Sequence, residues 1–120
     1  MASILIVEDE FLIAAAEEAA LEAVGHDVTV AVDGRAALAW LQEHTPDLIV
    51  TDYMMPRMDG GKLVAAVRAD PRLAPIPIIM VTATPRETIG SKGIDVQLLL
   101  PKPVMEAALL NAVSRLLAGH

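Results

Sequence analysis

Three acidic residues stand just after short apolar runs, and together they suit a divalent cation. Glu8 and Asp9 directly follow the run at 4–7, and Asp52 follows the run at 48–50 after one threonine. Carboxylates at close range repel one another, so the pKa of at least one is expected to rise unless a cation offsets the repulsion. Magnesium prefers such oxygen ligands. The chain has no cysteine and no suitably spaced pair of histidines, which argues against zinc.

A threonine and a lysine follow two further apolar runs. Thr82 directly follows the run at 78–81, and Lys102 comes shortly after the run at 96–100. The ammonium group supplies positive charge opposite the acids, and the hydroxyl can donate a hydrogen bond to an oxyanion. Phosphoryl transfer depends mostly on such positioning and charge neutralisation. Because an aspartate can form an acyl phosphate, Asp52, at the end of the central run, is the best candidate nucleophile.

Each of these residues also has an ordinary structural explanation. Asp9 taken alone would be the N-cap of the following helix, as Asp33 and Asp59 are expected to be for theirs. Lys102 alone would be a solvated loop lysine, and Thr82 alone would be a residue at a strand end without a function. It is the joint placement at four separate strand ends that favours a shared site.

Alternating strand and helix patterns are expected to bring these residues together. Four of the five apolar runs are nearly continuous, which is typical of parallel strands covered on both faces. Helical patterns separate them, and this alternation predicts a parallel sheet with helices on both faces. Ligands bind such sheets beyond the carboxyl ends of the strands. The expected strands are 4–7, 28–30, 48–50, 78–81 and 96–100.

Five helices are expected between and after the strands. The first runs from about residue 10 to residue 24 and ends at a left-handed Gly25. The second and third begin after Asp33 and Asp59. The fourth is short, because glycines end it early, and it begins with a capping box at Thr84–Glu87. The fifth runs from about 103 to 117. The first helix has an apolar side expected to face inward, at Ile13, Ala16, Ala20 and Val24, and an acidic side, at Glu17, Glu18 and Glu22.

Length and composition limit the class of protein. With 120 residues, 54% of them hydrophobic, the chain fits one globular domain over 1–120. A formal net charge of −7 without a basic cluster argues against nucleic acid as a direct partner. The first apolar run is too short for a signal peptide or a membrane span, so a cytoplasmic protein with no membrane partner is expected.

Four motifs, in this order and spacing, resemble the receiver domains of two-component response regulators. They are ILIVEDE at 4–10, DLIVTDYMMPRMDG at 47–60, VTA at 81–83 and PKP at 101–103, and the resemblance covers essentially the whole chain. It implies a flavodoxin-like α/β fold, which is a doubly wound parallel sheet of five strands in the order 2-1-3-4-5 with five helices. It also implies a stand-alone protein similar to the chemotaxis regulators.

Carried over residue by residue, the resemblance makes Asp52 the phosphoacceptor. Thr82 bonds a phosphoryl oxygen, Lys102 pairs with the phosphoryl group, and the Lys102–Pro103 peptide is expected to be cis. Mg²⁺ is the implied cofactor. Its implied ligands are Asp9, Asp52, Glu8 through water, and the backbone carbonyl of Met54.

The resemblance further implies a signalling role rather than an enzyme with a separate substrate. A histidine kinase or a histidine phosphotransfer protein donates the phosphoryl group, and the protein catalyses only its own phosphorylation and dephosphorylation. The modification switches a surface toward an unidentified output protein, or the phosphoryl group is passed on. This surface is expected on the fourth helix, fifth strand and fifth helix. Leu99, Leu110 and Leu117 would make it apolar and suited to a partner or a homodimer, with core packing as the alternative.

Two departures from the family pattern are Leu99 and the segment 82–99, which is short by about a turn and carries Gly90 and Gly93, so the fourth helix is expected to be short or mobile. Leu99 stands where the family usually has an aromatic residue, so the usual coupled movement of threonine and ring is not available. Met54, two residues after Asp52, is apolar and cannot position an attacking water, which predicts slow autodephosphorylation.

Other functions on the same fold remain as alternatives. A phosphorylation-independent docking module is favoured by Leu99 and by the short fourth helix, but disfavoured by the complete set of acidic, hydroxyl and ammonium groups. A flavin or nucleotide binder would need a glycine-rich loop where this chain has Glu8–Phe11. An aspartyl-phosphate hydrolase would need an acid at the position of Met54.

Overall fold

A computed structural model describes residues 1–119 as five strands alternating with five helices. The strands are β1 (Ser3–Val7), β2 (Asp27–Ala31), β3 (Leu48–Asp52), β4 (Ile78–Thr82) and β5 (Leu98–Pro101). The helices are α1 (Phe11–Ala23), α2 (Gly34–Leu41), α3 (Gly60–Ala69), α4 (Arg86–Ser91) and α5 (Glu106–Ala118). All strand pairs are parallel in the order β2-β1-β3-β4-β5, which confirms the predicted topology. Within 1–119, the helices lack the length and apolar character needed to cross a membrane.

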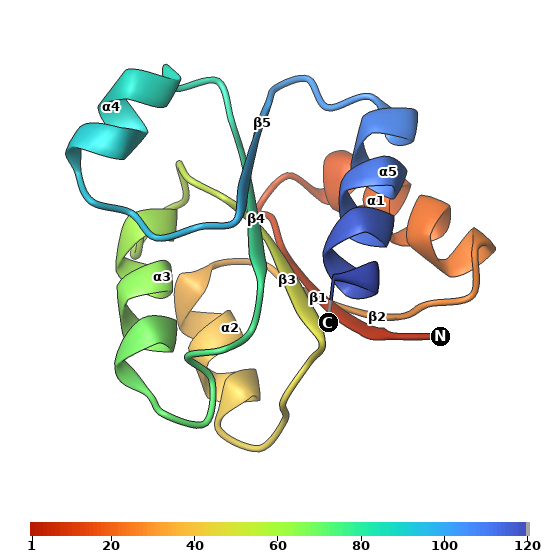
Figure 1. The fold of residues 1–120 in the computed structure, drawn as a ribbon, viewed down its shortest axis with the longest axis horizontal. Helices are drawn as coiled ribbons and strands as arrows, with labels where there is room; N and C mark the ends of the chain where they lie inside the picture. The colour runs from red at the N-terminus through yellow and green to blue at the C-terminus, as the bar shows by residue number, and fades with distance from the viewer. Residues whose placement is uncertain (120) are drawn as a thin grey trace.

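Helices cover both faces of the sheet, with α1 and α5 on one side and α2, α3 and α4 on the other (Figure 1). Each strand feeds both resulting cores, because successive side chains point to opposite faces. In β1, Ile4 and Ile6 pack toward one core, whereas Leu5 and Val7 pack toward the other. This two-sided burial explains why the strands are continuous apolar runs.

Several helix ends were predicted correctly. Asp33 and Asp59 are the N-caps of α2 and α3, where their carboxylates accept the N–H groups of Ala36 and Lys62. Gly25 has φ +96° after the end of α1, as expected of a left-handed residue. The fourth helix is short, and the Lys102–Pro103 peptide is cis.

Other expectations at helix ends were wrong. Pro85 is the N-cap of α4 and no side chain caps that helix, so the capping box at Thr84–Glu87 does not form. The N–H of Thr84 donates instead to Oγ1 of Thr82 at 3.0 Å. The alternative in which Asp9 only caps α1 does not hold either, since Glu10 is the N-cap and makes no side-chain bond there. The fifth helix begins at Glu106, about a turn later than predicted.

The inward face of α1 also differs from the prediction. Of the residues predicted to face inward, Ala20 is buried and Ile13 half-buried, whereas Ala16 and Val24 are exposed. The other buried residues of the helix are Ala14, Glu17 and Leu21. The first turns of α1 carry apolar residues almost all round, so helical spacing does not select a face there. Packing against the sheet and α5 decides the orientation, and it places Glu17 inside.

The surface formed by α4, β5 and α5 is less apolar than predicted. Leu99, Leu110 and Leu117 are half-buried and pack against the two cores, as in the alternative of core packing. Apart from Met1 and Val24, the large exposed apolar side chains within 1–119 instead lie in segments that follow the carboxyl ends of strands. They are Phe11, Leu12, Val32, Met54 and Met105.

Candidate functional site

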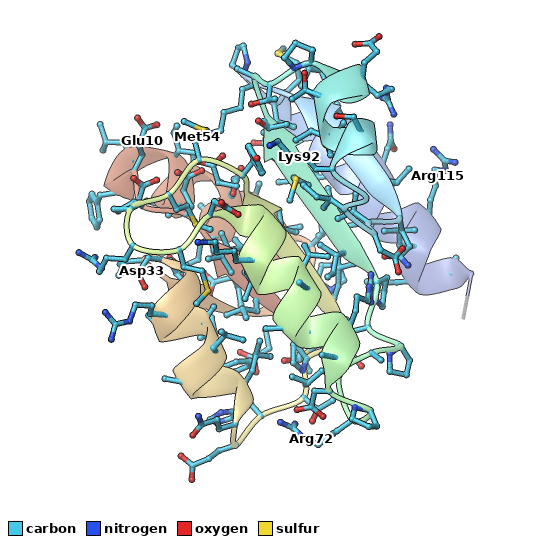
Figure 2. The ribbon with its side chains drawn as sticks, turned by 90° about the vertical axis from the view of Figure 1, so that its left-hand side faces the viewer. Glu10, Asp33, Met54, Arg72, Lys92 and Arg115 are labelled. Atoms are coloured by element: carbon cyan, nitrogen blue, oxygen red, sulfur yellow. The ribbon has the colours of Figure 1, made fainter. Side chains whose placement is uncertain are left out.

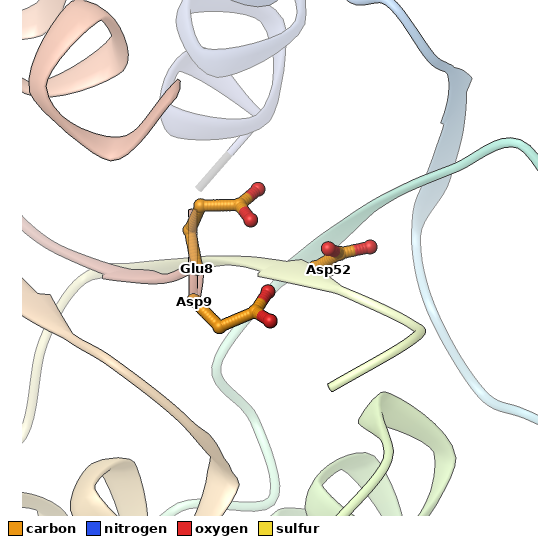
Figure 3. Close-up of side chains that lie close together, drawn as sticks. All are labelled: Glu8, Asp9 and Asp52. Atoms are coloured by element: carbon orange, nitrogen blue, oxygen red, sulfur yellow. The ribbon is translucent and has the colours of Figure 1, made fainter. Parts of the chain in front are cut away.

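The three predicted acids meet at the carboxyl edge of the sheet, where their side chains converge (Figure 3). Glu8 and Asp9 directly follow β1, and Asp52 is the last residue of β3. These strands are neighbours, with Val7 opposite Thr51, so the three residues end up side by side. One carboxylate oxygen from each lies within 4.8 Å of the other two. Glu8 and Asp52 are buried, whereas Asp9 is exposed.

Lys102 lies against this acidic cluster of Glu8, Asp9 and Asp52. Its Nζ is 2.7 Å from Oδ2 of Asp52 and 3.5 Å from Oε1 of Glu8. Thr82 is buried at the end of β4, one step beyond the residue that faces Asp52 across the strands. The backbone N–H of Lys102 donates to the carbonyl of Thr82 at 3.1 Å, which joins these two residues. The structure therefore places all five predicted side chains at one edge.

Hydrogen bonds orient the carboxylate of Asp52 and the hydroxyl of Thr82. Oδ1 of Asp52 accepts the N–H of Tyr53 at 2.7 Å, while Oδ2 accepts from Lys102. Oγ1 of Thr82 accepts the N–H of Thr84, so the hydroxyl hydrogen is free to donate to another oxygen. The arrangement can present a fixed carboxylate oxygen to an electrophile, with an ammonium and a hydroxyl nearby to bind negative charge.

Burial and mutual repulsion shift the pKa values of groups in and beside the acidic cluster. The pKa of Glu8 is raised to about 7, mainly by burial and also by the charges of Asp52 and Asp9, while the backbone hydrogen bond from Glu10 and the charge of Lys102 oppose the rise. At least one raised pKa was predicted, although burial contributes more than repulsion. Burial lowers the pKa of Lys102, but its hydrogen bond with Asp52 and the surrounding acids outweigh burial and raise that pKa overall. Lys102 is therefore a permanent cation at neutral pH.

The donor set fits a hard divalent cation. Three carboxylates offer oxygen atoms within a few ångströms of one another, and the chain has no cysteine. Magnesium is commonly held by one or two carboxylates and waters, which leaves positions for phosphate oxygens. Met54, whose backbone carbonyl is the further predicted ligand, lies in the loop after β3 with its side chain 68% exposed.

Glu17 is a fourth buried acid near this site, and the sequence pattern missed it. The residue is only 6% exposed on the inner side of α1. The pKa of its carboxyl is raised to about 7, mainly by burial, with the charges of Glu8 and Asp52 contributing to the rise and Lys102 opposing it. An acid interrupting an alanine-rich helix is the only sequence signal, and it is usually a solvated residue.

Replacing Glu17 with leucine is expected to stabilise the protein at neutral and alkaline pH. The unfolded chain releases this proton near the ordinary pKa of 4.5, whereas the folded protein keeps it to about 7. Stability is therefore lost as pH rises through this interval. Because part of the carboxylate still meets solvent, the gain in the leucine variant should be on the order of 2 kcal/mol above pH 7 and much smaller below the unfolded pKa.

Urea unfolding across this pH range measures the effect, with Trp40 as the single tryptophan reporter. Glu22→Leu makes the same chemical change at an exposed position of α1 and should give no pH-dependent gain. A gain for Glu17→Leu of equal size at acidic and alkaline pH would show that packing, and not the charge, is responsible.

Gly60 allows the start of α3 to approach the backbone of Asp52. A Cβ at this position would overlap the carbonyl oxygen of Asp52 and lie 2.9 Å from Cα of Tyr53. The N–H of Gly60 also donates to the carbonyl of Tyr53 at 2.7 Å, which closes the base of the intervening loop. Asp52 and the loop after it are therefore held by a contact that has no room for a side chain.

Gly60→Ala is expected to lower the free energy of unfolding by about 1–3 kcal/mol, since the backbone must shift to admit the methyl group. Urea unfolding measures the loss. Gly90→Ala is the matched control, because a Cβ there meets open space on α4. That control should be neutral or stabilising. Equal stability of the Gly60 variant and the wild type would contradict the close contact.

Comparison with known proteins gives one family across the chain. Residues 4–114 match the response regulator receiver domain. Protein PilH of Pseudomonas aeruginosa is 34% identical over 121 residues, which cover 99% of this chain and 100% of PilH. The gliding motility regulatory protein of Myxococcus xanthus is 36% identical over 77% of this chain, and the transcriptional regulator RpaA of Synechocystis is 38% identical over 79%. The matched part is only 12% and 39% of those two longer proteins.

Solved structures share the fold over nearly the whole chain. The chemotaxis response regulator CheY4 of Vibrio cholerae superposes with a TM-score of 0.91 at 32% identity, covering 97% of this chain and 98% of that one. The receiver domain of a Pseudomonas aeruginosa sensor histidine kinase gives 0.90 at 28% identity, covering 98% of each chain, and contains magnesium in its active-site cleft. Fold, motifs and matched length agree, and the chain belongs to the response regulator receiver domain family.

Proposed function

We propose that Asp52 accepts a phosphoryl group from the phosphohistidine of a partner protein, with Mg²⁺ bound at the acidic cluster. The observation that carries this proposal is the convergence of three carboxylates within 4.8 Å, faced by one ammonium group at 2.7 Å from Asp52. A structural ion pair would match one acid to one lysine. Here three carboxylates face a single ammonium group, so the site has excess negative charge that a bound cation would neutralise. The magnesium in the related sensor kinase receiver domain supports the same choice of ion.

The residues of the acidic cluster have different roles in phosphoryl transfer. Glu8, Asp9, Asp52 and the carbonyl of Met54 would hold Mg²⁺, which supplies positive charge to the transferring oxygens when bound. A carboxylate oxygen of Asp52 attacks the phosphorus while the phosphorus–nitrogen bond to the donor histidine breaks. The electron pair of that bond leaves with the imidazole, and an aspartyl phosphate forms on Asp52.

Lys102 and Thr82 then hold the product. Once an oxygen of Asp52 carries the phosphoryl group as an acyl phosphate, Lys102 exchanges its carboxylate partner for a phosphoryl oxygen. The hydroxyl of Thr82, whose oxygen already accepts from Thr84, donates to another phosphoryl oxygen. A cavity of about 280 Å³ beside these residues, lined by Leu99 and Arg86 among others, gives Thr82 room to move without an aromatic partner.

Exposed apolar side chains around the site indicate where partner proteins would bind. Exposed Phe11 and Leu12, at 81% and 80%, stand at the start of α1 beside the acids and suit contact with the apolar side of a helix. We infer that a histidine kinase or histidine phosphotransfer protein docks there. An unidentified output protein, or a second copy of the chain, would read the phosphorylated state at α4, β5 and α5.

Incubation with acetyl phosphate tests the proposed function. With Mg²⁺, intact-mass spectrometry should show one added phosphoryl group per chain, and peptide mapping after borohydride reduction should place it on Asp52. Chelation of the metal with EDTA should prevent the addition, because the acids then repel the incoming phosphate. Absence of phosphorylation in the presence of Mg²⁺, or modification at another residue, would favour the docking module without phosphorylation.

Met54→Asn is expected to shorten the lifetime of the aspartyl phosphate. The methionine side chain is exposed beside Asp52 and offers no hydrogen bond to water, whereas asparagine can orient an attacking water molecule. One such hydrogen bond corresponds to about tenfold faster hydrolysis. Decay of the phosphorylated protein after removal of acetyl phosphate measures the rate. Met105→Asn, at another exposed rim position, should leave it unchanged, and an unchanged rate in Met54→Asn would refute this role.

A further inference from the structure

An ion pair outside the acidic cluster ties the loop between β3 and α3 to the start of α2. Nη2 and Nε of Arg57 lie 2.6 and 3.0 Å from Oδ2 of Asp33. The side chain of Asp33 is only 6% exposed, and its other oxygen accepts the N–H of Ala36 at 2.8 Å. That backbone hydrogen bond, together with the one from Arg57, holds the pKa of Asp33 below its ordinary value. Asp33 is therefore a charged, fixed anchor for the loop.

The backbone at Arg57 adopts a conformation that side chains disfavour. Its φ is +68°, and it is the only non-glycine residue within 1–119 with positive φ. The N–H of Met58 donates to the carbonyl of Pro56 at 2.7 Å, which closes a three-residue turn around Arg57. Glycine would take this conformation without strain, whereas any other residue brings its Cβ close to the backbone. Such strain persists only where surrounding contacts hold it, and the ion pair supplies that contact.

The loop is fixed at its tip and at its base. Next to the ion pair, Met58 packs on Gly34 so closely that a Cβ there would lie 3.0 Å from Cγ and Sδ of the methionine. At the base, Gly60 donates to Tyr53. Met54 lies between these fixed points, and Figure 2 shows Met54 and Asp33 beside the loop at the same end of the molecule. The path of the backbone at Met54 thus depends on both contacts, the Arg57–Asp33 ion pair at the tip and the Gly60–Tyr53 hydrogen bond at the base.

We propose that the Arg57–Asp33 pair positions the carbonyl of Met54 for Mg²⁺ and thereby sets the affinity of the metal site. This inference rests on the proposed function, since it takes the acidic cluster as the Mg²⁺ site. Arg57 acts through the loop, because its guanidinium is engaged by Asp33. It is a positioning residue, and its effect should appear in metal binding without any phosphoryl donor.

Two single variants separate loop positioning from simple electrostatics. Arg57→Gly removes a positive charge and relaxes the turn, so electrostatics alone predicts tighter Mg²⁺ binding. Asp33→Asn removes a negative charge but keeps a good N-cap, so electrostatics alone predicts weaker binding. Loop positioning predicts weaker binding in both variants, because each loses the same contact.

Calorimetric titration of the metal-free protein with magnesium chloride measures these affinities. Each single variant should bind Mg²⁺ about fivefold more weakly than the wild type, and the double variant no more weakly than either. Arg72→Ala is the control, since it removes the same charge at the opposite end of the molecule (Figure 2), where Arg72 contacts His44 and Thr45. Its affinity should match the wild type. Thermal unfolding without metal checks folding, and Arg57→Gln replaces the glycine variant if that one does not fold.

Each outcome decides the matter. Tighter binding by Arg57→Gly, or losses that add in the double variant, would overturn the positioning role of the pair. Equal binding by the wild type and all variants would overturn this inference and leave the proposed function standing. Failure of the wild type itself to bind Mg²⁺ would remove both.

Discussion

Asp52→Asn is expected to abolish Mg²⁺-dependent phosphorylation by acetyl phosphate. The amide matches the carboxylate in shape and can still accept the N–H of Tyr53, which lies 2.7 Å from Asp52 in the wild type. It cannot act as the nucleophile, because its oxygen carries no full charge. Intact-mass spectrometry after incubation with the donor should therefore show only the unmodified chain.

A matched control exists on the same edge of the sheet. Asp59→Asn makes the identical change at the N-cap of α3, where asparagine caps as well as aspartate, so phosphorylation should proceed as in the wild type. Phosphorylation of Asp52→Asn at the wild-type rate would place the nucleophile elsewhere and end the proposed mechanism.

Lys102→Met should slow phosphorylation about 10²- to 10³-fold, which is the usual contribution of one donor that stabilises developing negative charge. Methionine keeps the length of the side chain but removes the ammonium that lies 2.7 Å from Asp52. Mg²⁺ binding should persist or tighten, since the acids lose a competing cation. Rapid-quench measurement of the initial rate, together with magnesium calorimetry, separates the two effects.

Lys92→Met is the control for this charge change, because Lys92 is exposed at the end of α4, away from the acidic cluster. Its phosphorylation rate should equal that of the wild type. If Lys102→Met reacted as fast as Lys92→Met, then Lys102 would have only a structural role in pairing with the acids.

The fold was predictable because its strongest signals are local. Continuous branched apolar runs indicated buried parallel strands, and acidic residues before glycine marked the starts of α2 and α3. The site followed from the topology, since parallel strands place their carboxyl ends at one edge. Glu8, Asp52 and Lys102 could be grouped without knowledge of any distance, because each comes at or just after a strand end.

The errors arose where tertiary contacts decide the outcome. Glu17 was assigned to the solvent side, because an alanine-rich helix has no clear polar face until it packs on its neighbours. The capping box before α4 failed, because the N–H of Thr84 found a partner in Thr82. The Arg57–Asp33 pair joins two loops 24 residues apart, and no periodic pattern encodes such a contact.

The hydrogen bond from the backbone of Lys102 to the carbonyl of Thr82 has a consequence for how this protein can change over generations. It joins the backbones of two residues whose side chains would meet the phosphoryl group in the proposed mechanism, so a displacement of one strand end carries both. Natural selection therefore acts on the ends of β4 and β5 together, because neither can move without the other. A substitution that shifts the backbone at one of these strand ends also shifts the other, so lineages that alter the response should accumulate compensating changes on both strands together.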